Sequence, residues 1–199
     1  MESMGSEGPP CREWEKDRRR ALSRLREHLE KGLVDEDIAG FLAELNEAAE
    51  AFYTTSSCSG RVAVLEGEDL FSKKGARILV AWHDPGKCRT GITGYCDYKP
   101  SGVSIAWVSL QPPILHVAAR DEETARAIVR CAESAGFIRA CYKARKPCGY
   151  HVEVAGHDKL HVILPAPCSL LRQACNVLER YKERLRRLEE CLLRLARGG

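Results

Sequence analysis

Six consecutive residues with hydroxyl or thiol side chains, Thr54 to Ser59, stand before Gly60 and Arg61 in the segment FYTTSSCSGR. Hydroxyl groups and backbone N–H groups around a glycine bind anions and polar ligands, and an arginine adds charge-assisted hydrogen bonds to phosphate or carboxylate. The segment lies between an expected helix and an expected strand, so we predict a loop, where binding sites are common. Such hydroxyls also bond their own backbone, which leaves a purely structural loop as the alternative.

Two histidines at the ends of strand-like runs could act as a general base. His83 follows the apolar run 78–82, and His116 lies inside PPILHVAA. Imidazole titrates near neutral pH, and beside Cys58 it would activate a thiol nucleophile. The spacing alone does not bring these residues together, and an isolated histidine on a strand is more often structural. His151 and His161, in alternating runs, have that structural interpretation.

A basic stretch follows the middle of the chain, with FIRACYKARKPCGY over 137–150 and no acidic residue. Cations mixed with aromatic rings suit single-stranded nucleic acid, because cations contact phosphates and rings stack on bases. The alternative is a solvated surface strand. The basic residues of the stretch are Arg139, Lys143, Arg145 and Lys146.

The ten cysteines include no CxxC pair, so a zinc ribbon is excluded and no metal is expected. The first ten residues, MESMGSEGPP, lack the features of a secretion signal. We therefore expect most cysteines to be buried or reduced thiols, with room for one or two disulfides. No apolar run approaches the roughly 20 residues that span a bilayer, so we predict a cytoplasmic protein without membrane contacts.

Apolar residues at helical spacing predict helices over 14–31, 35–50 and 121–135. Asp35 or its neighbours should cap the second helix, and Asp121 the third. The segment between His83 and Ser101 is rich in glycine and proline and is typical of a loop or hairpin. The expected strands are 61–65, 76–82, 103–110, 113–119, 137–143, 150–155 and 159–164.

The last helix carries apolar residues in alternating steps of three and four from Leu171 to Leu195, which predicts a coiled-coil-type seam. We expect this seam to pack on the N-terminal helix of the same chain rather than on a second chain, although both a monomer and a homodimer stay open. A single domain over 1–199 is predicted, with N-terminal helices (11–50), an α/β core (52–165) and the C-terminal helix (168–197).

The sum is an α+β fold: a mixed β-sheet core with helices at both termini and one between the strand groups. The run VAVLEGED resembles the opening of a doubly wound methyltransferase, but no glycine-rich turn follows the acid. Neither GxGxxG nor GxxxxGK occurs, so a Rossmann-type fold and a P-loop are not supported.

Five segments, taken in order, resemble one family: KGLVDEDI, FYTTSSCSGR, ILVAWH, PPILHV and SAGF. They are similar to the tRNA wybutosine-synthesizing protein 3 family, from about residue 15 into the final helix. TTSSCSGR is the most specific of these segments. The stretch after 136–137, RACYKARKPCGYHVEV, departs from the family's glycine-containing pattern.

The resemblance implies an S-adenosylmethionine-dependent methyltransferase outside the doubly wound fold class. Its substrate would be the tricyclic guanine derivative beside the anticodon of tRNA(Phe), methylated on ring N-4. The loop would hold either the amino-acid end of the cofactor or the side chain of the substrate base, and His83 or His116 would act as the base. The basic stretch would follow the phosphates of the anticodon loop. The residues implied for the cofactor site are Ser56, Ser57, Cys58, Ser59, Gly60 and Arg61.

Two other functions stay open. A non-enzymatic RNA-binding module explains the basic stretch but gives the hydroxyl-rich segment no task. A thiol hydrolase would use Cys58 with a histidine, and would require a reactive thiol.

Overall fold

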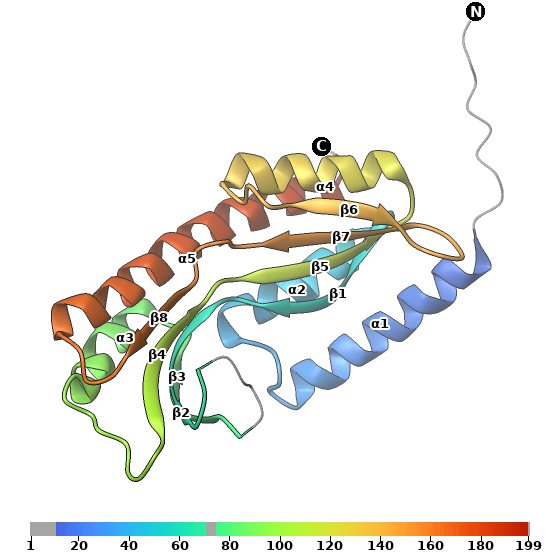
Figure 1. The fold of residues 1–199 in the computed structure, drawn as a ribbon. Coiled ribbons are helices and arrows are strands. Elements are labelled where there is room, and N and C mark those ends of the chain that lie inside the picture. Colours follow the sequence, from blue (N-terminus) through green and yellow to red (C-terminus); the bar gives the residue numbers. More distant parts are fainter. Residues whose placement is uncertain (1–10, 71–74, 199) are drawn as a thin grey trace, which may run out of the picture.

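A computed structural model describes residues 11–70 and 75–198 and shows helices packed on a strongly bent β-structure (Figure 1). Residues 1–10, where no secretion signal is expected, lie outside the described ranges. The helices are α1 (Arg12–Glu30), α2 (Glu36–Ala48), α3 (Pro85–Gly91), the 3₁₀ helix η1 (Ile92–Tyr95), α4 (Glu122–Ala135) and α5 (Cys168–Ala196). The strands are β1 (Phe52–Cys58), β2 (Arg61–Gly67), β3 (Arg77–Trp82), β4 (Ile105–Gln111), β5 (Ile114–Ala119), β6 (Cys141–Ala144), β7 (Tyr150–Ala155) and β8 (Leu160–Ile163).

The strands form two four-stranded sheets, in the orders β1-β5-β7-β6 and β3-β2-β4-β8, and every pair is antiparallel. Three stretches of chain cross from one sheet to the other: β1 continues into β2, β4 into β5, and β7 into β8. The α+β class is confirmed. The expectation of one mixed sheet is wrong, because each of these crossing stretches breaks its pairing at a bend.

The hydroxyl-rich segment is a strand and not the predicted loop. Phe52 to Cys58 pair with β5, with an irregularity between Thr54 and Ser56. Phe52 and Tyr53 are buried and anchor the start of this strand. β-Branched and aromatic residues favour strands, and here they outweigh the run of serines.

The segment 83–101 also differs from its prediction, since it holds α3 and η1. Asp84 begins α3, where its Oδ1 accepts a hydrogen bond of 2.6 Å from the backbone N–H of Lys87. Pro85 follows at the first helical position, which suits proline because that N–H needs no partner. The glycines and prolines therefore mark the ends of short helices here.

The helix over 122–135 is confirmed, with Asp121 accepting from the backbone N–H of Thr124 at 2.8 Å. The seam of α5 is confirmed as intramolecular, because Leu171, Leu178 and Leu188 are fully buried. Its partner was predicted wrongly, however. α5 packs mainly against α4, α3 and α2, while α1 packs on β1 and α2. No helix in the described ranges combines the length and apolar character needed to cross a bilayer.

Eight of the ten cysteines form disulfides, so the expectation of mostly reduced thiols is wrong. Three of the bonds tie α5 to α3, to the end of η1 and to α4, and the fourth ties the start of α1 to the β6–β7 connection. Closing loops of this length in the unfolded chain stabilises a fold by about 2–4 kcal/mol per bond. The pairs are Cys88–Cys175, Cys96–Cys168, Cys131–Cys191 and Cys11–Cys148.

Candidate active site at the bend between the sheets

The bend between β1 and β2 is made by Ser59 and Gly60, both buried. Gly60 has φ +82°, and a Cβ there would lie 2.8 Å from Cδ of Pro113 and 2.9 Å from its backbone nitrogen. Only glycine allows both this conformation and this approach. The bend therefore brings the end of β1 against the start of β5, and turns the Ser59 and Gly60 carbonyls toward α5.

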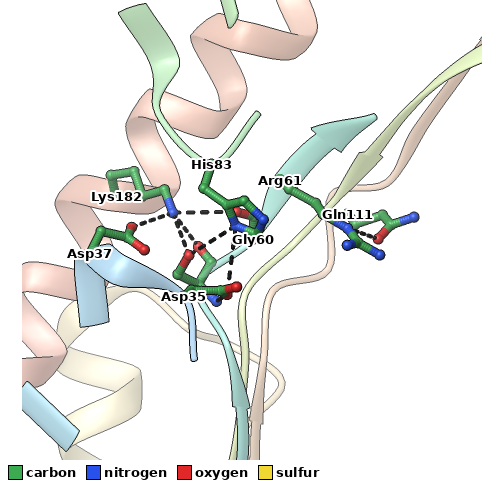
Figure 2. A network of polar contacts seen from close by, with 8 residues as sticks. Asp35, Asp37, Gly60, Arg61, His83, Gln111 and Lys182 are labelled. Carbon is green, nitrogen blue, oxygen red and sulfur yellow. Dashed lines mark hydrogen bonds and ion pairs between the residues drawn. The ribbon is translucent and has the colours of Figure 1, made fainter. Parts of the chain in front are cut away.

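Lys182 of α5 closes this bend (Figure 2). Its ammonium donates to the Ser59 carbonyl at 2.8 Å, to Ser59 Oγ at 2.8 Å and to the Gly60 carbonyl at 3.3 Å. It also pairs with Asp37 Oδ2 at 2.6 Å, and its side chain is only 13% exposed. An ammonium this well shielded needs such partners, because desolvating it without them is costly.

Asp35 holds the other side of Ser59. Its Oδ2 accepts the backbone N–H of Ser59 at 2.7 Å and lies 3.6 Å from Nδ1 of His83. Asp35 occupies the N-cap position of α2, but its side chain makes no capping hydrogen bond. The carboxylate therefore accepts a hydrogen bond from the bend and not from the first turn of α2. Ser59 Oγ is also 3.4 Å from His83 Nδ1, so the Nδ1 side of the imidazole ring faces both Ser59 and Asp35.

A cavity of about 620 Å³ opens beside the network, between the start of α2, the β3–α3 connection and α5. This volume lies within the roughly 300–1,000 Å³ typical of small-molecule sites. Four acidic side chains, three lysine or arginine side chains and one histidine line it, with Trp82 and Leu185 as larger apolar surfaces. The lining residues are Glu36, Asp37, Ala81, Trp82, His83, Asp84, Pro85, Lys87, Lys182, Leu185, Arg186 and Glu189.

Glu189 is a cavity residue whose pKa is strongly shifted. Burial, with the nearby Asp37 carboxylate as the next cause, raises the pKa of Glu189 to about 7, and Lys182 and Arg186 oppose the shift. A carboxyl group with this pKa changes charge near neutral pH. A cationic ligand would therefore meet an acid that it can drive into the ionised form.

Comparison with known proteins now decides the family. The sequence profile of the family described as Methyltransferase TYW3 matches residues 16–196. The chain belongs to the TYW3 methyltransferase family. A Thermococcus sibiricus relative called tRNA(Phe) 7-((3-amino-3-carboxypropyl)-4-demethylwyosine(37)-N(4))-methyltransferase is 31% identical over 188 residues, covering 89% of this chain and 93% of its own. A relative from Pyrococcus horikoshii, called methyltransferase 1 of the same activity, is 31% identical, with 88% and 93% covered.

Solved structures share the fold of this chain. The structure of the PH1069 protein from Pyrococcus horikoshii has a TM-score of 0.76 at 31% identity and covers 90% of this chain and 95% of its own. A hypothetical protein from Aeropyrum pernix, at 19% identity and a TM-score of 0.54, covers 80% and 99% and shows the fold alone. The resemblance drawn from the five sequence segments is confirmed, as is the absence of a Rossmann-type architecture.

Of the expected cofactor residues, Ser59 and Gly60 join the network beside the cavity, and Arg61 does not. Arg61 Nε donates to Gln111 Oε1 at 2.7 Å, on the side of the strand away from Lys182 (Figure 2). Cys58 is half-buried, and burial raises the pKa of its thiol, with Asp35 adding to the rise. A reactive thiol needs the opposite shift, which argues against the thiol-hydrolase alternative.

The other members of the hydroxyl run bond protein groups on β1 and around it. Thr54 Oγ1 accepts from the Asn46 amide at 2.7 Å, inside the core. Ser56 Oγ lies 2.7 Å from Nδ1 of His116, on the other face of the strand. Ser57 lines a separate groove under α1 with Ser56. His83 and His116 thus belong to different groups, and only His83 lines the large cavity.

The four residues predicted to bind nucleic acid differ in their exposure to solvent and in their ion pairs. Arg139, Lys143 and Lys146 are exposed. Arg145 is instead held by an ion pair with Asp17 of α1 and donates to the Tyr53 hydroxyl at 3.2 Å. Its charge is already matched, so Arg145 differs from its exposed neighbours.

Three residues of the network and one residue of the cavity lining were missed as site residues from sequence: Asp35, Asp37 and Lys182, and Glu189. The two aspartates lie in the VDEDI part of a segment already noted for its resemblance, which is the one signal that pointed to them. Lys182 and Glu189 stand off the α5 seam among many charges. Their roles become visible only when α5 is laid against α2.

Proposed function

We propose that this TYW3 family member uses S-adenosylmethionine to methylate N-4 of 7-(3-amino-3-carboxypropyl)-4-demethylwyosine at position 37 of tRNA(Phe), the reaction in its relatives' names. The observation that carries the proposal is the 620 Å³ cavity, whose floor is the polar network at the bend. The step belongs to wybutosine biosynthesis, and such an enzyme would act in the cytoplasm on the anticodon loop.

The lining of the cavity suits the methyl donor. S-adenosylmethionine has a carboxylate, an ammonium, a positively charged sulfonium and an adenine ring. Lys87 and Arg186 can meet the carboxylate, while Asp84 and Glu189 match the two positive groups. Trp82, which packs edge-on against Tyr95 with ring centroids 6.0 Å apart, offers an aromatic surface to the adenine.

Methyl transfer from a sulfonium is an in-line displacement, so the enzyme chiefly has to align donor and acceptor. Such alignment lowers barriers by roughly 7–11 kcal/mol in favourable intramolecular cases. The Lys182 contacts fix the bend against α5 and thereby the wall along which both reactants would lie. Asp35, anchored by the Ser59 N–H, in turn orients His83.

His83 is our candidate base for any proton that N-4 must lose. Its Nδ1 faces Asp35 and Ser59, which leaves Nε2 on the opposite edge of the ring. A carboxylate 3.6 Å from Nδ1 stabilises the protonated ring that forms on proton transfer. His116 lies outside the cavity, so we assign it no part in this step.

The acceptor base lies in an anticodon loop and can be splayed out of its stack at limited cost. The exposed Arg139, Lys143 and Lys146 would meet the phosphates of that loop. A non-enzymatic RNA-binding module remains the competing function. It predicts tRNA binding without any affinity for S-adenosylmethionine.

The test incubates the purified protein with S-adenosylmethionine and tRNA(Phe) carrying the demethylated base, followed by mass analysis of the nucleosides. We expect a gain of one methyl group on the tricyclic base and heat of binding when S-adenosylmethionine is titrated alone. His83→Gln should slow the reaction at least tenfold and leave donor binding within twofold, whereas His161→Gln, on an exposed strand position, should change neither. Binding of tRNA without donor binding would overturn the proposal in favour of the RNA-binding module.

A further inference from the structure

Outside the cavity, one cluster of side chains has the composition of a metal site. His116 on β5 lies directly across from Glu153 on β7, and His151 is two residues before Glu153 on the same strand. Residues paired in this way, and residues two apart on a strand, point to the same face of a sheet. One ligand atom from each of the three residues lies within 4.8 Å of the others.

These side chains occupy the face of the first sheet that is turned away from its main core. Their strand neighbours Val117, Val152 and Val154 are buried in that core, on the opposite face. Ala118, two residues from His116, contacts Trp14 of α1 instead. The cluster therefore lies beside α1 on a half-exposed face, where an ion from solvent can enter.

The hydrogen bonding of His116 leaves one ring nitrogen unused. Nδ1 contacts Ser56 Oγ at 2.7 Å, and the other nitrogen, Nε2, is shielded from solvent yet has no hydrogen-bond partner among the described residues. Glu153 Oε2 is 3.4 Å from this Nε2, at a poor angle for a hydrogen bond. Two ligands about 2.0–2.1 Å from one tetrahedral ion are roughly 3.4 Å apart. The observed separation thus fits two ligands of a shared cation.

We propose that His116, His151 and Glu153 bind a divalent cation of the zinc class. Two imidazoles and one carboxylate form a ligand set typical of zinc sites that keep a fourth position open. Ser56 acts as the outer partner that fixes the His116 ring, a role that metal-binding histidines usually require. This site is independent of the methyl-donor cavity and of the function proposed for it.

Two neighbours modify the site. Lys143 is paired with His151 across β6 and β7, and its positive charge weakens cation binding. The side chain is exposed, so solvent and salt reduce this effect. Cys141, a free and exposed cysteine, is paired with Glu153 on the same two strands. Its thiol must be removed from any test, because an exposed thiol binds zinc by itself.

The test uses the full-length chain in a Cys141→Ser background, freed of metal with a chelator and kept without thiol reductant. ZnCl₂ is titrated by calorimetry, and CoCl₂ by visible absorption, which reports the coordination geometry. We expect one ion per chain and the intense bands of a four-coordinate cobalt site. His151→Ala and Glu153→Gln should each lower the affinity at least tenfold, His161→Ala should leave it unchanged, and Lys143→Gln should raise it severalfold.

Thermal unfolding keeps the test decisive if a variant is less stable. Added zinc should raise the Tm of the parent protein, because the ion binds only the folded state, and should not raise that of His151→Ala. The absence of zinc binding by the parent protein would overturn the proposal. So would His151→Ala and Glu153→Gln variants that bind zinc as tightly as the parent.

Discussion

Two serines three residues apart on one stretch of chain occupy opposite environments. Ser59 is fully buried and bonded to Lys182 and Asp35 beside the cavity. Ser56 is exposed and bonded to His116 on the open face of the first sheet. Three residues of strand span only about 10 Å, and side chains an odd number of residues apart point to opposite faces, so the two serines lie on opposite sides of the chain. Residue type is the same in both, and the side of the strand decides what each serine can do.

The two groups also differ in how their charged and polar atoms are paired. At the bend, the shielded Lys182 ammonium contacts a carboxylate and backbone carbonyls, so its charge is satisfied by groups of the same chain. On the sheet face, Nε2 of His116 is shielded and has no hydrogen-bond partner among the described residues, with the Glu153 carboxylate 3.4 Å away. We therefore expect the Lys182 contacts to fix the shape of the cavity wall, and the His116 cluster to bind an added divalent cation.

Lys182→Met should have the largest effect. It leaves Asp37 and two buried carbonyl groups without their donor, which costs roughly 1–3 kcal/mol of unfolding free energy. Because the bend forms a wall of the cavity, we also expect methyl transfer to fall by about two orders of magnitude, a barrier change of about 2.7 kcal/mol. Denaturant unfolding and single-turnover assays measure the two effects.

Lys99→Met is the matched control for that change, since Lys99 is exposed. A surface substitution of this kind changes stability by no more than about 0.5 kcal/mol. Equal effects of the two substitutions would remove Lys182 from the site and with it the distinction between the two regions.

Ser59→Ala and Ser56→Ala should have opposite profiles. Ser59→Ala removes a buried hydrogen bond of about 1 kcal/mol and should weaken donor binding without altering zinc affinity. Ser56→Ala should reduce zinc affinity about 10–100-fold, as outer partners of metal ligands do, and leave donor binding unchanged. Calorimetry with each ligand on each variant gives the result. If both variants lose the same ligand, the two regions form one site.

Glu189→Gln should change a pH dependence. The pKa of Glu189 is raised in the folded state to about 7, from 4.5 in the unfolded chain, so the folded state holds a proton that the unfolded state releases. Wild-type stability should therefore decline as pH rises from about 4.5 to 7 and then level off. That decline should be smaller in Glu189→Gln, as measured by denaturant unfolding across the window.

The same ionisation should appear in ligand binding. Affinity for the cationic donor should rise with pH through about 7 in the wild type, because the ionised carboxylate attracts it, and Glu189→Gln should lose this rise. Calorimetry in buffers of different ionisation enthalpy should detect proton release on binding. A pH profile that survives the substitution would assign the titration to another group.

The smallest effects are expected on the basic stretch. Lys146→Ala should lower the salt dependence of tRNA binding by about one unit of slope, as the loss of one phosphate contact does. Arg145→Ala should change that slope less, since Asp17 already matches its charge, and should instead loosen α1. Titrations of tRNA at several salt concentrations, with unfolding curves for both variants, compare the two. A larger slope change in Arg145→Ala would show that the ion pair opens on binding.

Much of this protein follows from its sequence. The periodicity of α5, the Asp121 cap and the strands over 103–110 and 113–119 were predicted because helical and strand spacing are local properties. The family follows from short motifs in a fixed order, and TTSSCSGR pointed to the segment whose residues 59–60 make the polar contacts at the bend. Local residue types could not show that β1 is a strand, since its serines favour turns and its pairing with β5 is long-range.

Tertiary structure alone decided the rest. Lys182 and Asp37 are 145 residues apart, and their ion pair exists only because α5 packs on α2. The disulfides likewise join cysteines 60–137 residues apart, a pairing that spacing cannot reveal. His116 and Glu153 became neighbours through sheet register. In each case the contact depends on how distant elements pack, whereas a sequence pattern reports only the few residues on either side of it.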